Sequence, residues 1–152
     1  MAEAAKTPRQ IWMSVLARAS AAELHLHLQD APQLPDFRTL RGPEAGLVMV
    51  RGRAGGGGAA FNLGEMSVTR CTVRDAEGRI GHAYVSGRDA AQAELAARID
   101  AALQNPDRHD ALQDAVIAPL AEAQSAARQL IQRKAAATRV QFFTLATMRS
   151  DS

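Results

Sequence analysis

The feature that most constrains the fold is a central block of strand-like sequence between two helical regions. From about residue 37 to residue 87, β-branched and apolar residues gather in short runs separated by turn residues, which is typical of strands. Residues 9–29 and residues from about 89 to 135 instead carry apolar residues at helical spacing. Consecutive strands flanked by helices predict an α+β fold, an antiparallel sheet with helices packed on one face.

The helical region before the strands divides in two. Apolar residues recur at helical spacing over residues 9–19, which predicts the first helix. Ser20-Ala-Ala-Glu23 is a capping box, in which the Ser and Glu side chains satisfy free amides at a helix start. A second helix is therefore expected over residues 21–29. His25 and His27 would point about 200° apart on that helix, so we interpret them as surface histidines rather than as a metal-chelating pair.

The helical region after the strands has its own start and stop signals. One helix is expected to begin near Asp89, and Asn105-Pro106 predicts the start of the next. Pro119 interrupts an apolar pattern that runs from 111 to about 135, so we expect two helices or one kinked helix there. Residues 138–145 are rich in β-branched and aromatic side chains and predict a final strand.

The central block contains a predicted hairpin. Residues from about 62 to 74 are expected to form one strand, Asp75-Ala-Glu-Gly78 a turn, and residues 79–86 the next strand. Cys71 and His82 fall on these two strands, so a thiol activated by a nearby base is one interpretation. A lone buried thiol is the more common outcome for such a cysteine.

A candidate binding site follows the first apolar strand. Strand alternation places Leu47, Met49, Arg51 and Arg53 on one side. The apolar half of this strand is expected to lie under helices, and the basic half to emerge at the sheet rim beside a run of glycines at 55–58. Such a rim suits a phosphate or a partner's carboxylate, because guanidinium groups bind both. Two arginines in contact with water alone are the simplest alternative.

The glycine run itself supports two interpretations. Gly55-x-Gly57-x-x-Ala60 superficially matches a dinucleotide-binding fingerprint, but that fingerprint requires a following helix, and the sequence after it is strand-like. A Walker loop is excluded because the chain contains no Gly-Lys-Ser/Thr. A flexible connection and a nest of backbone amides that binds an anion both remain.

Length and composition limit the class of protein. A chain of 152 residues fits one domain over 1–152, with the first few and last few residues expected to be disordered. The single cysteine permits no internal disulfide, which fits a reducing compartment. We find no signal-peptide pattern and no apolar run near the roughly 20 residues that span a membrane. Acidic and basic residues are interspersed, so we expect a cytoplasmic protein that binds neither membrane nor nucleic acid.

Four segments carry a resemblance to a known family. They are Leu40-Arg-Gly-Pro-Glu-Ala-Gly-Leu-Val-Met-Val-Arg-Gly-Arg53, Phe61-Asn-Leu-Gly-Glu-Met-Ser-Val-Thr-Arg-Cys71, Gly81-His-Ala-Tyr-Val-Ser-Gly-Arg-Asp89 and Thr138-Arg-Val-Gln-Phe-Phe-Thr144. In this order they resemble the small G subunit of the bacterial carbon–phosphorus lyase core complex, and the resemblance extends from Trp12 to about Thr144. The four-glycine run and the ending Leu-Ala-Thr-Met-Arg149 look like local departures from it.

The resemblance implies an accessory role in phosphonate breakdown. In that family the core complex attaches an alkylphosphonate to C1 of the ATP ribose and displaces adenine, and a separate radical subunit later cleaves the carbon–phosphorus bond. The nucleosidase-like I subunit is expected to carry the exchange chemistry, with the G subunit as its required companion. ATP is then a substrate of the complex, and this chain is expected to bind no cofactor or metal of its own.

No catalytic residue is carried over to this chain by the resemblance. Candidates for binding substrate or a partner come from the rim and from the second family segment: Arg51, Arg53, Gly55, Gly56, Gly57, Gly58, Asn62, Glu65 and Arg70. Two alternative functions remain open. The chain is a scaffold without contact to substrate, or it is a stand-alone module that binds phosphate or a nucleotide at the rim.

Overall fold

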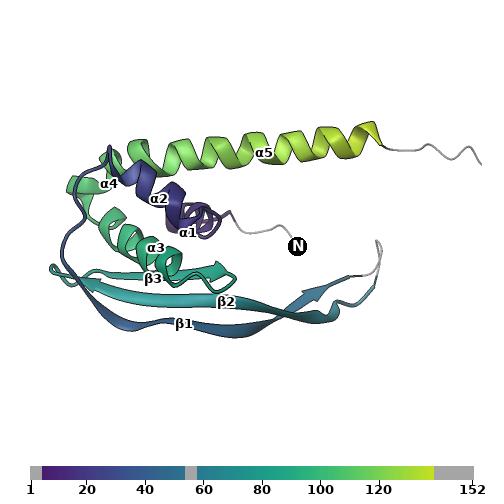
Figure 1. Cartoon of the computed structure of the whole chain (residues 1–152), viewed down its shortest axis with the longest axis horizontal. Helices are drawn as coiled ribbons and strands as arrows, with labels where there is room; N and C mark the ends of the chain where they lie inside the picture. Colours follow the sequence, from purple (N-terminus) through teal and green to yellow (C-terminus); the bar gives the residue numbers. More distant parts are fainter. Residues whose placement is uncertain (1–4, 54–57, 139–152) are drawn as a thin grey trace, which may run out of the picture. The chain divides into compact units, whose positions relative to one another are not determined.

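The computed structural model describes residues 5–53 and 58–138 of the chain (Figure 1). The fold is α+β, as the sequence predicts, with helices packed against a three-stranded antiparallel sheet. The chain forms two units, residues 1–121 and residues 122–152, so the single domain over 1–152 stays a prediction. The elements are α1 (Pro8–Leu16), α2 (Ala21–Leu28), β1 (Phe37–Gly52), β2 (Phe61–Asp75), β3 (Ile80–Ser86), α3 (Ala90–Leu103), α4 (Pro106–Leu112), a π-helical turn (Gln113–Ile117) and α5 (Ala118–Ala137).

The sheet has the order β1-β2-β3. β2 and β3 form the predicted hairpin, and its turn is held by Asp75, whose carboxylate accepts the backbone N–H groups of Glu77 at 2.9 Å and Arg79 at 2.8 Å. Gly78 adopts φ +88° in this turn, a conformation that L side chains avoid. A short turn between two antiparallel strands therefore fixes the register of the hairpin.

The core lies between the hairpin and α3, and Figure 1 shows α1, α2 and α3 on the same side of the sheet. Alternate residues of β2 and β3 are buried there, among them Cys71, Val73 and Val85. Gly81 permits the close approach of α3, because a Cβ on it would lie 1.9 Å from the carbonyl oxygen of Ala97. Any larger residue at this position would push the helix away from the sheet.

A buried carboxylate connects the first helix to the rest of the unit. The Asp100 side chain on α3 is fully buried and accepts hydrogen bonds from the Trp12 indole at 2.8 Å, from the Arg9 guanidinium at 3.2 and 2.8 Å, and from the backbone N–H of His82 at 2.9 Å. Such a charge is stable in a core only when it is paired and hydrogen-bonded. Sequence reasoning missed this group, because its partners lie 18 to 91 residues away along the chain.

The predicted helix starts are confirmed. Ser20 and Glu23 form the capping box at α2, and Asp89 and Asn105 cap α3 and α4. The helix expected over 9–19 ends earlier, at Leu16. The two helices expected on either side of an interruption are α4 and α5, and the π-helical turn that joins them ends at Ile117, two residues before Pro119. A proline nitrogen cannot donate the hydrogen bond that a regular helix needs.

Two predictions for the strands need comment. The first strand is much longer than the run 47–53 suggested, since β1 begins at Phe37. The strand expected over 138–145 falls, except for Thr138, outside the described residues.

Candidate functional site

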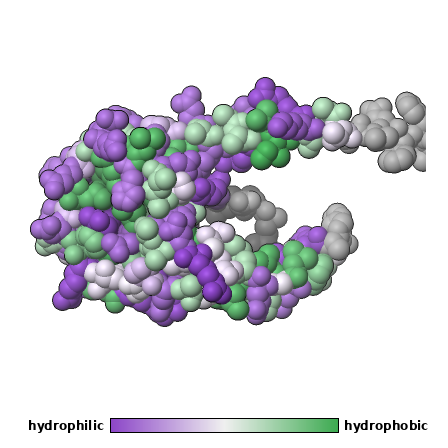
Figure 2. All heavy atoms as spheres, viewed as in Figure 1, coloured by the Kyte–Doolittle hydropathy of each residue, from purple (hydrophilic) through white to green (hydrophobic). Residues whose placement is uncertain are grey.

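The rim lies on a two-stranded extension of the sheet. β3 pairs with β2 only from Val68 onward, whereas β1 and β2 continue together to the pair Gly52 and Phe61 (Figure 1). We call residues 47–52 of β1 and 61–67 of β2 the arm. The arm holds six of the twelve large apolar side chains that are exposed in the described residues, and Figure 2 shows apolar surface on it. These six are Leu47, Val48, Met49, Phe61, Leu63 and Met66.

The expectation that Leu47 and Met49 lie under helices is wrong. They pair with Ser67 and Glu65, which share the face of the buried Thr69, so they do point to the helix side of the sheet. They are nevertheless 62% and 53% exposed. The reason is length: the 14 residues of α3 rise about 21 Å, whereas the 16 residues of β1 extend about 53 Å.

The basic end of the arm is open to solvent. Arg51 pairs with Asn62 across the strands and donates a hydrogen bond to the carbonyl oxygen of Ala60 at 3.3 Å. Arg53, Gly58 and Asn62 are exposed. The register shifts by one residue between Val50 and Arg51, because β2 has one extra residue, Leu63, between the partners Gly64 and Asn62. The other three glycines of the run, 55–57, lie outside the described residues.

Arg70 belongs to a different cluster on the outer face of the sheet. Its Nε donates to Glu44 Oε1 at 2.7 Å, and Arg41 Nε donates to the same oxygen at 2.6 Å. These hydrogen bonds, first that of Arg41 and then that of Arg70, lower the pKa of Glu44. Glu44 raises the pKa of Arg70, and the Tyr84 hydroxyl adds to that rise. Arg70 is thus held in place by a carboxylate of its own chain.

A bulge in β1 aligns this cluster. The register shifts between Arg41 and Glu44, where Gly42 has φ +72° and precedes a cis proline. A Cβ on Gly42 would lie 2.4 Å from the carbonyl oxygen of Arg70. Glycine is therefore required for the bulge that brings Glu44 opposite Arg70.

The candidate residues do not form one site. Arg51 and Asn62 face each other at the end of the arm, and Glu65 is exposed three residues further along β2, opposite Met49. Arg70 lies eight residues from Asn62, or about 26 Å along an extended strand. The structure thus separates the rim (Arg51, Arg53, Gly58 and Asn62) from the outer cluster around Arg70.

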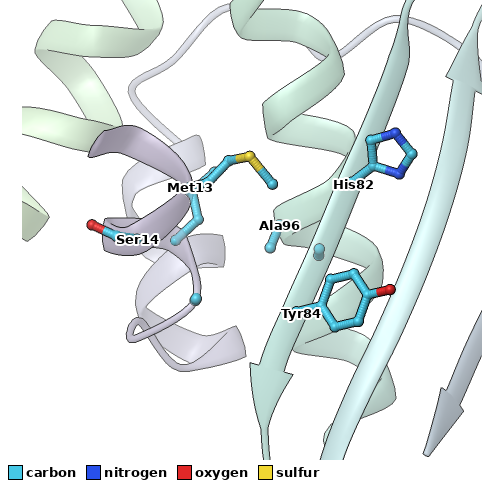
Figure 3. A pocket seen from close by; sticks show the side chains of 8 residues that line it. Met13, Ser14, His82, Tyr84 and Ala96 are labelled. Atoms are coloured by element: carbon cyan, nitrogen blue, oxygen red, sulfur yellow. The ribbon is translucent and has the colours of Figure 1, made fainter. Parts of the chain in front are cut away.

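A small hollow between α1 and β3 was not predicted from the sequence. Its volume is about 210 Å³, and Met13, Ser14, Tyr84 and Ala96 are among the residues that line it (Figure 3). The Ser14 hydroxyl donates to the carbonyl oxygen of its own helix at Ile11, 2.9 Å away. Figure 3 shows Ser14 and His82 on different sides of the hollow, so they do not form a nucleophile and base pair.

Of the two interpretations of Cys71, the lone buried thiol is the one that fits the structure. Cys71 is 1% exposed on the helix side of the sheet, and burial raises the pKa of its thiol, with a smaller contribution from Glu94. His82 projects from the other face, where Nδ1 lies 3.1 Å from the hydroxyl of Thr72. His82 therefore does not activate this thiol.

His25 and His27 lie on the helix α2, as the sequence predicted. Across the described residues, no three His, Cys, Asp or Glu side chains gather closely enough to hold a metal ion. In the same part of the chain, no helix is long and apolar enough to cross a membrane.

Comparison with known proteins identifies the family. Residues 7–148 match the family described as "Phosphonate metabolism protein PhnG". The chain belongs to this family. It is also 43% identical over 152 residues to the "Alpha-D-ribose 1-methylphosphonate 5-triphosphate synthase subunit PhnG" of Rhizobium meliloti (strain 1021), and this match covers 95% of the chain and 97% of the relative. The resemblance found from the sequence segments is thereby confirmed, and the protein takes part in phosphonate metabolism.

Proposed function

We propose that the chain is an accessory subunit of a complex that transfers an alkylphosphonate to C1 of the ATP ribose and releases adenine. The observation that carries this proposal is the full-length, 43% identical relative, whose name is that of a synthase subunit for ribose 1-methylphosphonate 5-triphosphate. That name describes a ribose with a methylphosphonate at carbon 1 and a triphosphate at carbon 5. ATP already carries the 5-triphosphate, so exchange of its base at C1 for the phosphonate accounts for the compound.

Three side chains of catalytic residue types are held in structural roles, which supports an accessory role. Asp100 is saturated with hydrogen bonds inside the core, and Cys71 is buried with a raised pKa. His82 faces the hydroxyl of Thr72. We therefore place the exchange chemistry on the other subunits, chiefly the nucleosidase-like I subunit, with ATP as a substrate of the cytoplasmic complex and no cofactor on this chain.

Within the complex we assign the rim to an anion. Arg51 has one hydrogen bond to a backbone carbonyl, and Arg53 and Gly58 are exposed. Two guanidinium groups beside backbone amides suit the triphosphate or the phosphonate. A carboxylate of a partner is the alternative for the same groups. Arg70 is less suited to substrate, because Glu44 already occupies its Nε.

The test is reconstitution from purified subunits. With ATP and methylphosphonate, the complete complex should release adenine, this chain alone should release none, and the complex lacking this chain should lose most of its turnover. Turnover by the isolated chain would contradict the accessory role. Full turnover without it would show that the chain is dispensable for the transfer.

A further inference from the structure

The sheet has one face that the described residues of unit 1–121 leave uncovered. In this unit, α1, α2 and α3 lie on the other side of the sheet (Figure 1). Register and alternation place two kinds of residue on this outer face. Towards the turn between β2 and β3 they are basic, and on the arm they are apolar. The face is therefore divided along its length into a basic half and an apolar half.

The basic half carries an excess of positive charge. Arg38 and Arg74 are directly opposite each other on β1 and β2, and both are exposed. Arg41 and Arg70 follow, and these two share the carboxylate of Glu44. Arg38 and Arg74 line a hollow in this part of the surface, and Asp36 lines it too. Like charges directly opposite across two strands destabilise a sheet, so acidic groups from outside the chain would stabilise this arrangement.

The arm, which provides the apolar half of the outer face, also has apolar side chains on its opposite face. Val48 pairs with Met66 on the outer face, and both are 38% exposed. Leu47 and Met49 are more exposed still and lie on the opposite face. A continuous apolar run such as 47–50 is typical of a strand that is covered on both faces. Two strands alone are marginally stable in water, so the arm has the composition of an element that another protein encloses.

We propose that the arm and the adjoining outer face bind a different subunit of the complex, one that holds the arm in an apolar cleft and sets acidic side chains against Arg38, Arg41, Arg70 and Arg74. This inference rests on the proposed function, because it names where that complex meets this chain. A second copy of the chain fits less well. In a two-fold symmetric contact the same patch lies on both sides, so the arginines would face arginines or the apolar half.

The first experiment measures binding of the full chain to a complex of the other core subunits assembled without it. The variant Leu47→Ser/Met49→Ser changes two exposed side chains of the arm. We expect its dissociation constant to rise about 100-fold, as for central residues of an interface. The matched control is Ile11→Ser/Leu26→Ser, whose residues are 51% and 59% exposed on α1 and α2. The control should stay within about threefold of wild type, and circular dichroism should show both variants folded.

The second experiment tests the charged half through its salt dependence. Binding of the wild-type chain should weaken as salt is raised, and Arg38→Ala/Arg74→Ala should reduce that dependence. Arg88→Ala is the control, an exposed arginine in the loop after β3, and it should leave the dependence unchanged.

The outcomes separate the surface from the function. If wild type binds and the Leu47/Met49 variant binds equally well, this surface is wrong while the accessory role stands. The same holds if sedimentation shows an isolated dimer that this variant dissociates, which would assign the arm to a second copy. If wild type does not bind the other subunits at all, both the surface and the proposed function fail.

Discussion

The substitution Asp100→Asn tests the account of how α1 is fixed to the sheet and α3. It keeps the size of the side chain but replaces one acceptor oxygen by an amide nitrogen. Oδ1 accepts from Trp12 and from Arg9 Nε, and Oδ2 accepts from Arg9 and from the backbone N–H of His82. Whichever oxygen is replaced, two donors lose their acceptor and face another donor.

The size of the effect follows from these two lost bonds. A hydrogen bond to a charged group contributes about 1.5–3 kcal/mol. The Arg9 side chain is 38% exposed and regains part of this from water, so its share is discounted. We expect a loss of about 3 kcal/mol in the free energy of unfolding, which lowers Tm by about 6–12 °C in a chain of this size.

The assay is urea denaturation followed by circular dichroism, with Asp107→Asn as the matched control. Asp107 is exposed in the first turn of α4, and its substitution should change the free energy of unfolding by less than about 1 kcal/mol. Equal stability of Asp100→Asn and wild type would refute the assignment of Asp100 as the anchor of α1.

Three further predictions concern the core and the rim. Gly81→Val should destabilise the chain by about 3 kcal/mol, because the added Cβ meets the backbone of α3. The control is Gly46→Ala, whose Cβ would have nothing within 4 Å and which should cost about 1 kcal/mol or less. Equal thermal stability of the two variants would contradict the close packing of α3 on Gly81. The native Cys71 thiol should react with a disulfide reagent at least about 100-fold more slowly than in urea. Because burial raises its folded pKa above the usual 9.0, its contribution to stability is complete below that value and declines as pH rises above it; unchanged reactivity on unfolding would be inconsistent with burial. Arg53→Ala and Arg51→Ala should each reduce adenine release by the assembled complex about ten- to a hundredfold with assembly intact. A salt-dependent loss of assembly would instead indicate that the arginines bind a partner's carboxylate. No change in adenine release or in assembly would remove the rim from the candidate sites.

Local signals in the sequence predicted the fold well wherever neighbouring residues decide the structure. Ser20 and Glu23 mark the start of α2 because the two side chains bond to amides only three residues away. The same holds for Asn105, and for Asp75 in the turn between β2 and β3. Hairpins and caps are determined by such short-range hydrogen bonds.

Features that depend on distant residues or on broken alternation could not be predicted. The bulge at Gly42 shifts the phase of β1, so the strand could not be followed back from Leu47 to Phe37. Exposure of Leu47 depends on where α3 ends, which no local pattern reports. For the candidate site, the structure pairs Arg51 with Asn62, which no local pattern predicted, and it separates Arg70 from them.

The long sequence distance between Trp12 and Asp100 has a consequence for synthesis. The ribosome makes α1 first, but the carboxylate that receives its indole N–H comes 88 residues later. At elongation rates of about 5–20 residues per second this interval lasts about 4–18 s. During that time Trp12, Leu16 and Leu24, all buried in the finished core, have no core to enter. The nascent N-terminal helices therefore keep these apolar side chains without their final partners until α3 has emerged.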